Sequence, residues 1–396
     1  MSLARRLPEV LVPALLVLAT ALLGLAVSSY LQAYFLDTLI KVAIVVGLYV
    51  FIGNSGVLSF GQISFVAVGA WTAGVLTVPK EQKLVLMPGL AHFLVTTTVG
   101  NVASLALAAA VGAVFAFAVG AWTAGVLTVP EGQKRITMPG LAHFLLTTNV
   151  GNVASLALAA VIGGIFAFAV GLPLMRLSGL AAGIATFGVL EITNNVLTYE
   201  QRIGPGLNAF SSVPSTTGIW QAAIGGVICV AVAYVYQRTR FSRMLRATRE
   251  DPAAAAAAGI SIYRQRLLAF TLSGALAGFA GGLYVHLQPL QAGGLSLDLT
   301  FITLAMLVVG GSGSLLGAVV GALALNGLFS FFSAATNTVD VFGWSLTVPS
   351  GTAELALGAL MAVVLILRPS GLTGGRELSL PRRRAVVDLE KARVTT

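Results

Sequence analysis

The chain has 396 residues, of which 57% are hydrophobic and only 9% are charged. A soluble domain usually carries about 25% charged residues, so this composition excludes an ordinary soluble protein and predicts a surface that faces lipid. The net charge of +9 could indicate nucleic-acid binding, but the basic residues stand beside apolar runs, as in cytoplasmic membrane loops. The sequence therefore predicts an all-α protein, a polytopic bundle of transmembrane helices of which some are broken or re-entrant. We expect it to contact the lipid bilayer and to bind no nucleic acid.

Nine apolar segments are candidates for membrane-spanning helices, since about 20 residues cross a bilayer core. They are expected at 10–29, 36–53, 57–78, 149–172, 179–198, 218–236, 267–287, 300–334 and 352–367, and glycines break the run 300–334. We expect one transmembrane domain, 1–372, of about 8–11 spans and a cytoplasmic basic tail, 373–396. The positions of the basic residues predict a multi-pass protein of the bacterial inner (plasma) membrane with both termini in the cytoplasm.

Glycine-rich sequences interrupt two of these apolar segments, at 53–62 and at 310–321. Unwound backbone at membrane depth must be buried in protein or face water, and interruptions in the two halves of a chain indicate a transport pathway. Close helix packing through small residues is the alternative, and both interpretations can hold together. The polar residues of these two segments, expected to line a translocation path, are Asn54, Ser59, Gln62, Ser312 and Ser314.

Residues 67–120 and 118–171 are tandem copies that agree at 43 of 54 positions. They indicate a recent duplication or an error in the assembled sequence, because a repeat architecture needs three or more units. The extra apolar run near 98–128 would make about 45 Å of helix, too long for one untilted span and too short for two. We expect a re-entrant or bent hairpin that leaves the later topology intact, because the basic loop opposes inversion.

Charged residues also occur inside three of the expected spans, and one of them, Glu354, lies close to a span end. Glu191 and Asn194 lie three residues apart, on one helical face, and an ionisable residue within a span faces the bundle interior or water. We expect both to line the translocation path. The alternative is that Glu191 lies near the outer interface and only stabilises packing. Asp37 and Lys41, four residues apart, are interpreted as a structural interface pair.

The basic loop 237–266 contains the strongest local signal for a helix. Six alanines at 253–258 favour a helix; Asp251 can cap its start, Pro252 suits its first turn, and Gly259 can end it. A short surface helix flanked by charges is suited to docking on a partner. The alternative is a cytoplasmic loop without a docking role, whose basic residues only reflect the excess of Lys and Arg on the cytoplasmic side of membrane proteins.

Four motifs in order resemble the permease subunits of the branched-chain amino acid family of ATP-binding-cassette transporters. They are GLYVFIGNSGVLSFGQISFVAVGAWTAGVL, GLPLMRLSGLAAGIATFGVLEI, FSRMLRATREDPAAAAAAGISIYRQRLLAFTLSGALAGFAGGLY and LVVGGSGSLLGAVVGALAL. The resemblance implies an ATPase-coupling element in the basic loop, made of Arg246, Arg249, Glu250, Asp251, Ala254, Ala255 and Gly259. It also implies two cytoplasmic ATPase subunits, a second related permease and an external solute-binding protein. The duplication, and the loop after Asn195, depart from the family pattern.

The chain has no G-x-x-x-x-G-K-[ST] phosphate loop, and its three histidines form no metal-spaced cluster. We therefore expect no catalytic residue, no metal site and no directly bound cofactor, with ATP used by the partner subunits. The expected function is import of branched-chain or related amino acids by alternating access. The main alternative is a self-contained secondary transporter or channel for a small polar solute, which would couple through intramembrane acids such as Glu191. A membrane-embedded enzyme would need clustered His, Asp or Glu.

Overall fold

The computed structural model describes the bundle of helices but not the whole chain. The described residues are 8–59, 152–177, 180–199, 217–285, 287, 297–335, 339–341, 344–346, 349, 351–375 and 377. The expected hairpin near 98–128, Gln62, most of both duplicated copies and the tail after 377 lie outside them.

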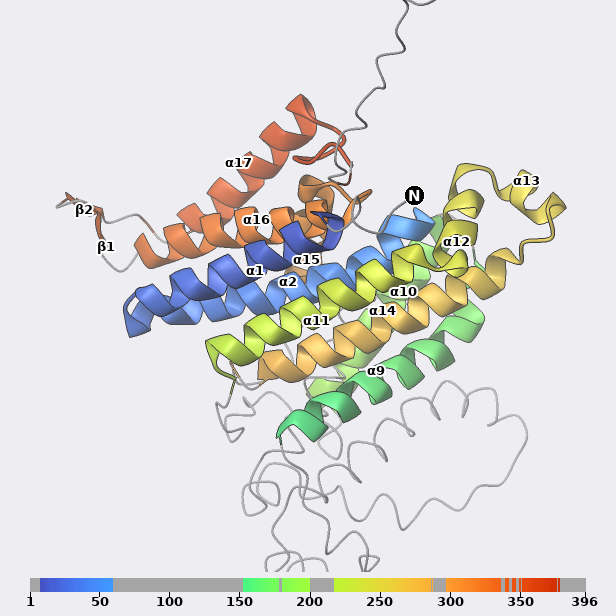
Figure 1. Ribbon diagram of the computed structural model, residues 1–396, viewed down its shortest axis with the longest axis horizontal. Coiled ribbons are helices and arrows are strands. Elements are labelled where there is room, and N and C mark those ends of the chain that lie inside the picture. The colour runs from blue at the N-terminus through green and yellow to red at the C-terminus, as the bar shows by residue number, and fades with distance from the viewer. Residues whose placement is uncertain are drawn as a thin grey trace, which may run out of the picture.

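Helices make up nearly all of the described chain (Figure 1). They are α1 (Pro8–Ala26), α2 (Ser29–Ser55), α9 (Asn152–Leu174), α10 (Leu180–Tyr199), α11 (Ile219–Arg238), α12 (Arg240–Glu250), α13 (Pro252–Ala257), α14 (Ile262–Val285), α15 (Leu297–Gly310), α16 (Leu315–Ala335) and α17 (Thr352–Leu367). A small antiparallel ribbon, β1 (Val339–Val341) and β2 (Trp344–Leu346), joins α16 to α17. Five helices are long and apolar enough to cross a membrane: Pro8–Ala26, Leu31–Ser55, Ile219–Arg238, Ile262–Tyr284 and Leu315–Ala335. The predicted polytopic helical bundle is confirmed.

Helix α2 forms the centre of the bundle. It packs against α1, α11, α14, α15 and α16, and its side chains from Leu39 to Val46 are almost completely buried. A helix that is apolar on all sides is expected to be enclosed in this way. The Ser273 hydroxyl of α14 donates a 2.6 Å hydrogen bond to the Gly47 carbonyl of α2. These two backbones therefore approach closely, as small residues allow in membrane bundles.

The run expected at 300–334 is two helices, α15 and α16, separated by a turn at 311–314. Gly311 in this turn has a φ of +114°, a backbone conformation that favours glycine. The two helices then fold against each other without room for side chains, because a Cβ on Gly321 would lie 2.0 Å from the Met306 carbonyl oxygen. The glycines that break this apolar run are therefore also what lets its two halves pack.

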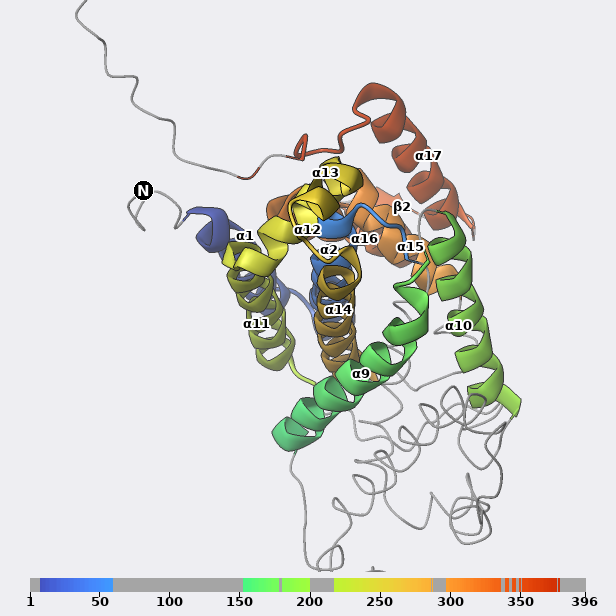
Figure 2. The same ribbon diagram turned by 90° about the vertical axis from the view of Figure 1, so that its right-hand side faces the viewer.

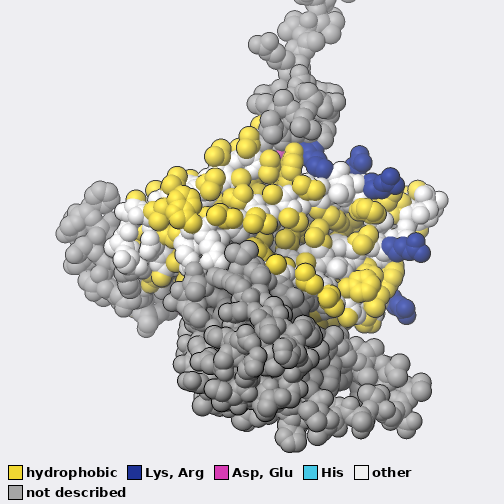
Figure 3. Space-filling view, turned by 60° about the horizontal axis from the view of Figure 1, so that its bottom comes forward, with side chains coloured by type: hydrophobic (Ala, Val, Ile, Leu, Met, Phe, Trp, Pro, Cys, Tyr) yellow, Lys and Arg dark blue, Asp and Glu magenta, His cyan; other side chains and the backbone are white. Residues whose placement is uncertain are grey.

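Many helix ends meet at one end of the bundle, where α12 and α13 lie; we call it the basic end. Arg238, at the end of α11, forms an ion pair with Glu9 at the start of α1. Tyr263, at the start of α14, donates a 3.0 Å hydrogen bond to the Leu172 carbonyl near the end of α9. On the face drawn in Figure 3, Lys and Arg side chains gather at one end and hydrophobic side chains cover much of the rest of the described surface. The first described helix thus begins, and α17 ends, at the same end of the bundle as the basic loop.

Candidate functional site

Helix α12 is an amphipathic helix that packs on α2, α11 and α14 at the basic end (Figure 2). The hydroxyl of Thr239 caps its first turn by accepting a 3.3 Å hydrogen bond from the backbone N–H of Ser242. Ser242, Leu245 and Thr248 are buried, and their spacing of three residues places them on one face of the helix. The opposite face exposes Arg240 and Arg243. This distribution fixes α12 to the bundle by one side and leaves the other side free for a partner.

The buried face of α12 is hydrogen-bonded to the last turn of α2 through Asn54, which is 1% exposed. The Asn54 side-chain oxygen accepts from the Ser242 hydroxyl and from Arg246 Nε, both at 2.9 Å. Arg249 Nη1 donates to the Gly53 carbonyl at 2.8 Å. Cationic side chains are favourable at a helix C-terminus, where carbonyl groups lack helical partners. The structure thus brings Arg246, expected in the coupling element, into contact with Asn54, expected on the path, and places Arg249 on the neighbouring Gly53.

Helix α13 has the caps that the sequence predicts. The Asp251 carboxylate accepts from the backbone N–H groups of Ala253 and Ala254 at 2.9 and 3.0 Å, and Pro252 occupies the first turn. Ala255 is the buried residue of this short helix, whereas Ala254 and the preceding Glu250 are exposed.

The C-terminus of α13 is closed by a glycine in the left-handed region. Gly259 has a φ of +79° and donates to the Ala256 carbonyl, while Ile260 donates to the Ala255 carbonyl, both at 3.0 Å. This pair of hydrogen bonds is a Schellman motif, which glycine favours at the residue after the C-cap. Asp251 and Gly259 therefore fix the two ends of an exposed helical projection.

The two glycine-rich interruptions meet at the basic end. A Cβ on Gly53 would lie 2.6 Å from the carbonyl oxygen of Ser312 in the turn between α15 and α16. In that turn Ser314 is fully buried, and its hydroxyl accepts from the Gly317 N–H at 2.9 Å, capping the start of α16. The end of α2 is thus packed between α12 on one side and the α15–α16 turn on the other.

Residues 368–377, which we call the C-terminal segment, pack into the same break. The backbone N–H groups of Leu372 and Thr373 donate to the carbonyls of Val309 and Gly310 at 2.8 and 3.2 Å. The Thr373 hydroxyl also bonds Gly310 and lies 3.0 Å from the Ser314 hydroxyl. The structure therefore packs the beginning of the expected tail onto the bundle.

Glu377 extends this packing to two other helices. Its Oε1 accepts from the Leu315 N–H at 2.6 Å, at the start of α16, and from Gln237 Nε2 of α11 at 3.1 Å. Gln237 also donates to the Tyr49 hydroxyl of α2. Sequence reasoning missed these contacts of Tyr49, Gln237 and Glu377, although Tyr49 lies in the first quoted motif, because each contact joins residues more than 60 positions apart.

The remaining residues expected on the path lie elsewhere. Ser59 is 2% exposed, and its hydroxyl has no hydrogen-bond partner among the described residues. Glu191 lies on α10, where Asn195 donates to its backbone carbonyl at 2.8 Å and to its carboxylate at 3.3 Å. The side chain of Asn194 lies outside the described part of the chain. Within the described part, no three His, Cys, Asp or Glu side chains are grouped so that they could hold a metal ion.

Comparisons with known proteins find transport permeases. Residues 132–367 match the family model described as "Branched-chain amino acid transport system / permease component". The chain is 30% identical over 152 residues to "Probable branched-chain amino acid transport permease protein LivH" of Methanocaldococcus jannaschii, covering 37% of this chain and 45% of the relative. It is 28% identical over 235 residues to the "High-affinity branched-chain amino acid transport system permease protein LivM" of Escherichia coli (50% and 52% covered).

The name of a third relative mentions a different solute. The "Autoinducer 2 import system permease protein LsrC" of Klebsiella pneumoniae is 28% identical over 203 residues, covering 49% of this chain and 56% of the relative. The chain spans about half the length of these curated relatives. No solved structure matches the chain.

Proposed function

The chain belongs to the branched-chain amino acid transport permease family, and on this premise we propose that it is the membrane-spanning subunit of an ATP-binding-cassette importer for branched-chain amino acids or related solutes. The family consists of transport permease components rather than enzymes. The names of the relatives differ in their solute, so the family supports the transport of a small polar molecule in general. The four motifs, which resemble those of amino acid permeases, favour an amino acid.

The proposed transporter needs partners that this chain does not contain. Two cytoplasmic ATPase subunits supply the energy, a second related permease completes the pathway, and an external solute-binding protein delivers the solute. Helix α13, with Glu250 and Asp251 before it and Gly259 after it, is the proposed contact with the ATPase. The basic end then faces the cytoplasm, in accord with the distribution of positive charge in membrane proteins.

The observation that carries this proposal is the chain of contacts from α12 to the two glycine-rich interruptions. Arg246 and Arg249 hold the end of α2, and that end touches the α15–α16 turn at Ser312. A displacement of α12 and α13 by the ATPase would therefore move both interruptions together. Coordinated movement of packed helices of this kind is how alternating access proceeds in transporters with broken helices.

Binding of the ATPase to α13, and transfer of its movement from α12 to α2, can be tested separately with two variants. The double variant Glu250→Ala with Gly259→Val changes the ends of α13, because a β-branched residue cannot readily adopt the left-handed φ at position 259. We expect it to lose co-purification with tagged ATPase subunits. Arg249→Ala leaves α13 intact, so it should keep the ATPase and lose ATP-driven uptake. Arg243→Ala is the matched control, since Arg243 is an exposed arginine of the same helix.

Two results would contradict the proposal. The double variant could retain ATPase binding and full uptake, in which case α13 is not the contact. Alternatively, the purified chain could transport solute when reconstituted alone, which would favour a self-contained transporter or channel.

A further inference from the structure

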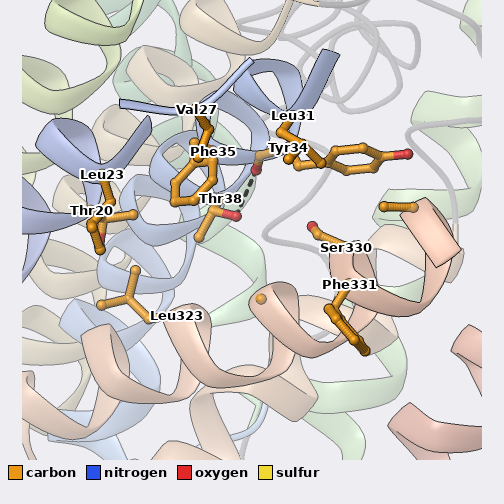
Figure 4. A pocket seen from close by; sticks show the side chains of 12 residues that line it. Thr20, Leu23, Val27, Leu31, Tyr34, Phe35, Thr38, Leu323, Ser330 and Phe331 are labelled. Carbon is orange, nitrogen blue, oxygen red and sulfur yellow. Dashed lines mark hydrogen bonds between the residues drawn. The ribbon is translucent and has the colours of Figure 1, made fainter. Parts of the chain in front are cut away.

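Two pockets of about 480 Å³ each differ in their chemistry. The first lies between α1, α2 and α16, and Figure 4 shows its walls of apolar side chains such as Leu23, Phe35 and Phe331. The second, which we call the arginine pocket, is lined by Met175, Arg176, Ile262, Tyr263 and Arg266. Among the described residues that line the two pockets, charged side chains belong only to the arginine pocket. This second pocket is therefore suited to a charged ligand.

The arginine pocket lies at the basic end, between the end of α9 and the start of α14. In Figure 1 these two helix ends lie on the same side of the bundle as α12 and α13. Arg176 stands two residues after α9, in a turn where its backbone N–H donates to the Pro173 carbonyl at 3.3 Å. Arg266 lies in the second turn of α14, and its Nη1 donates to the Leu177 carbonyl at 3.5 Å. Two elements distant in the sequence thus bring two guanidinium groups to one pocket.

Close packing of α9 on α14 fixes the walls of the arginine pocket. A Cβ on Gly163 of α9 would lie 2.9 Å from the Gly274 carbonyl oxygen of α14, so the two backbones touch. The Tyr263 hydroxyl, which donates to the Leu172 carbonyl at 3.0 Å, joins the start of α14 to the end of α9. A ligand would therefore meet a site that is already formed, and preorganisation lowers the cost of binding.

Neither arginine of the pocket has a carboxylate partner in the described part of the chain. The ion pairs found there join Asp37 with Lys41 and Glu9 with Arg238. Arg266 is half-buried, and its Nε is enclosed by protein without a hydrogen-bond partner among the described residues. Its outer guanidinium nitrogens are therefore the ones that can meet a ligand. Two positive charges at one pocket repel each other, and a phosphate group would offset this repulsion while its oxygens accept from the guanidinium N–H groups.

An exposed apolar stripe on α9 leads to the arginine pocket. Val161, Ile165, Phe168 and Leu172 are all exposed, and their spacing of three or four residues places them on one face of the helix. Arg176 follows Leu172 by four residues, at the end of this stripe. From Val161 to Leu172 the helix rises about 16 Å, which is close to half of the hydrocarbon core of about 30 Å. The stripe therefore has the length of one membrane leaflet and ends at a positive charge.

We propose that the arginine pocket binds the phosphate group of an anionic membrane lipid, with one acyl chain of this lipid along the stripe on α9. The inference needs only that the chain crosses a membrane, so it goes beyond the proposed import function. Basic pockets between helices at the cytoplasmic membrane surface bind anionic head groups in this way. Free phosphate has a suitable charge but would leave the stripe uncovered. A cytoplasmic partner protein could neutralise the arginines but would not reach the stripe, which lies at membrane depth.

Binding of phosphatidylglycerol to the purified full chain tests this site. Phosphatidylglycerol with a fluorescent acyl chain is titrated with the protein in a neutral detergent, and the fluorescence anisotropy gives the Kd. Arg176→Gln should raise the Kd by about tenfold, the loss expected for one hydrogen bond to a charged group. Arg264→Gln is the matched control, because it removes the same charge from an exposed arginine of α14 outside the pocket lining. It should raise the Kd much less, and equal effects of the two variants would overturn the proposal.

A second variant tests the other wall of the pocket. Arg266→Gln should weaken the binding of phosphatidylglycerol in the same direction as Arg176→Gln. Arg176 is exposed and makes no described side-chain contact within the bundle, so its replacement should leave the fold intact even if that of Arg266 does not. An unchanged Kd in Arg176→Gln would contradict the site.

Competition identifies the source of the phosphate group. Unlabelled phosphatidylglycerol should displace the fluorescent lipid, whereas phosphatidylcholine and inorganic phosphate at the same concentration should not. Phosphatidylcholine carries a cationic group beside its phosphate, which the arginines repel, and inorganic phosphate lacks an acyl chain. Displacement by phosphatidylcholine would show that the head-group charge is not recognised, and displacement by inorganic phosphate would assign the pocket to free phosphate. Either result would overturn the proposal.

A protein contact at the arginine pocket would give a different pattern. Arg176→Gln should keep co-purification with the ATPase subunits, because α13 is the proposed contact with them. Loss of the ATPase with an unchanged Kd for phosphatidylglycerol would make the pocket a protein interface and overturn the lipid site. Binding of phosphatidylglycerol at this pocket together with solute uptake by the isolated chain would support the site and contradict only the importer assignment.

Discussion

At the scale of single residues, Asn54 has the most constrained environment at the basic end. Its side-chain oxygen accepts two hydrogen bonds from α12, and its amide nitrogen donates to the Val50 carbonyl at 2.9 Å. One buried amide thus joins the last turn of α2 to the helix that precedes α13. The sequence placed Asn54 in a glycine-rich interruption and predicted a polar path there. It could not show the contact with Arg246, which lies 192 residues later.

Asn54→Ala should lower the stability of the protein, because the buried Ser242 hydroxyl and Arg246 would lose their acceptor. An unsatisfied buried polar group costs about 1–3 kcal/mol. Thermal unfolding of the purified protein in detergent measures this loss, and uptake should fall with it. Asn54→Asp is the matched control, since a carboxylate still accepts from both donors and should retain more stability. Equal stability of the wild-type and Asn54→Ala proteins would show that the contact between α2 and α12 contributes little.

At the scale of single elements, local sequence rules predict the ends of helices but not the contacts between helices. Helix α13 was predicted with its caps at Asp251 and Gly259, because capping depends on neighbours within a few positions. The break in the run 300–334 was predicted from its glycines. The close contact of Gly310 with Gly321, by contrast, depends on how two helices fold together, which no local rule specifies.

Gly321→Ala should disrupt the packing of α15 on α16. The new Cβ would lie 2.0 Å from the Met306 carbonyl oxygen, and backbone atoms cannot move aside as a flexible side chain can. Overpacking typically costs about 1–3 kcal/mol, and sometimes more. We expect a lower yield of folded protein in size-exclusion chromatography and a lower unfolding temperature. Gly327→Ala is the control on the same helix, because nothing lies within 4 Å of a Cβ at that position; a similar loss there would contradict the steric explanation.

At the scale of the whole molecule, composition together with the repeated apolar runs was enough to predict a membrane-spanning helical bundle. Apolar runs gave the approximate positions of the described spans, because length and hydropathy determine which segments cross a bilayer. The arrangement of the spans around α2 was not predictable, since nearly all of them are apolar on every side. The resemblance to amino acid permeases, based on four motifs, agrees with the family match over residues 132–367.

The orientation of the molecule in the membrane can be tested at two exposed serines. Ser28 lies between α1 and α2, and Ser261 lies between α13 and α14 at the basic end. In the Cys229→Ala background, a membrane-impermeant maleimide should label Ser28→Cys in intact cells and label Ser261→Cys only after lysis. The reason is that the side of a membrane protein rich in Arg and Lys faces the cytoplasm. The reverse pattern would place α13 outside the cell, beyond the reach of any cytoplasmic ATPase.

The C-terminal segment has a consequence for biogenesis. The start of α16 and the turn before it obtain hydrogen-bond partners from Thr373 and Glu377, which the ribosome makes only after every described helix. Until those residues emerge, the nascent chain lacks the hydrogen bonds by which Glu377 connects the start of α16 to α11. The helices can therefore enter the membrane in sequence, but these hydrogen bonds can form only after α17 has been made.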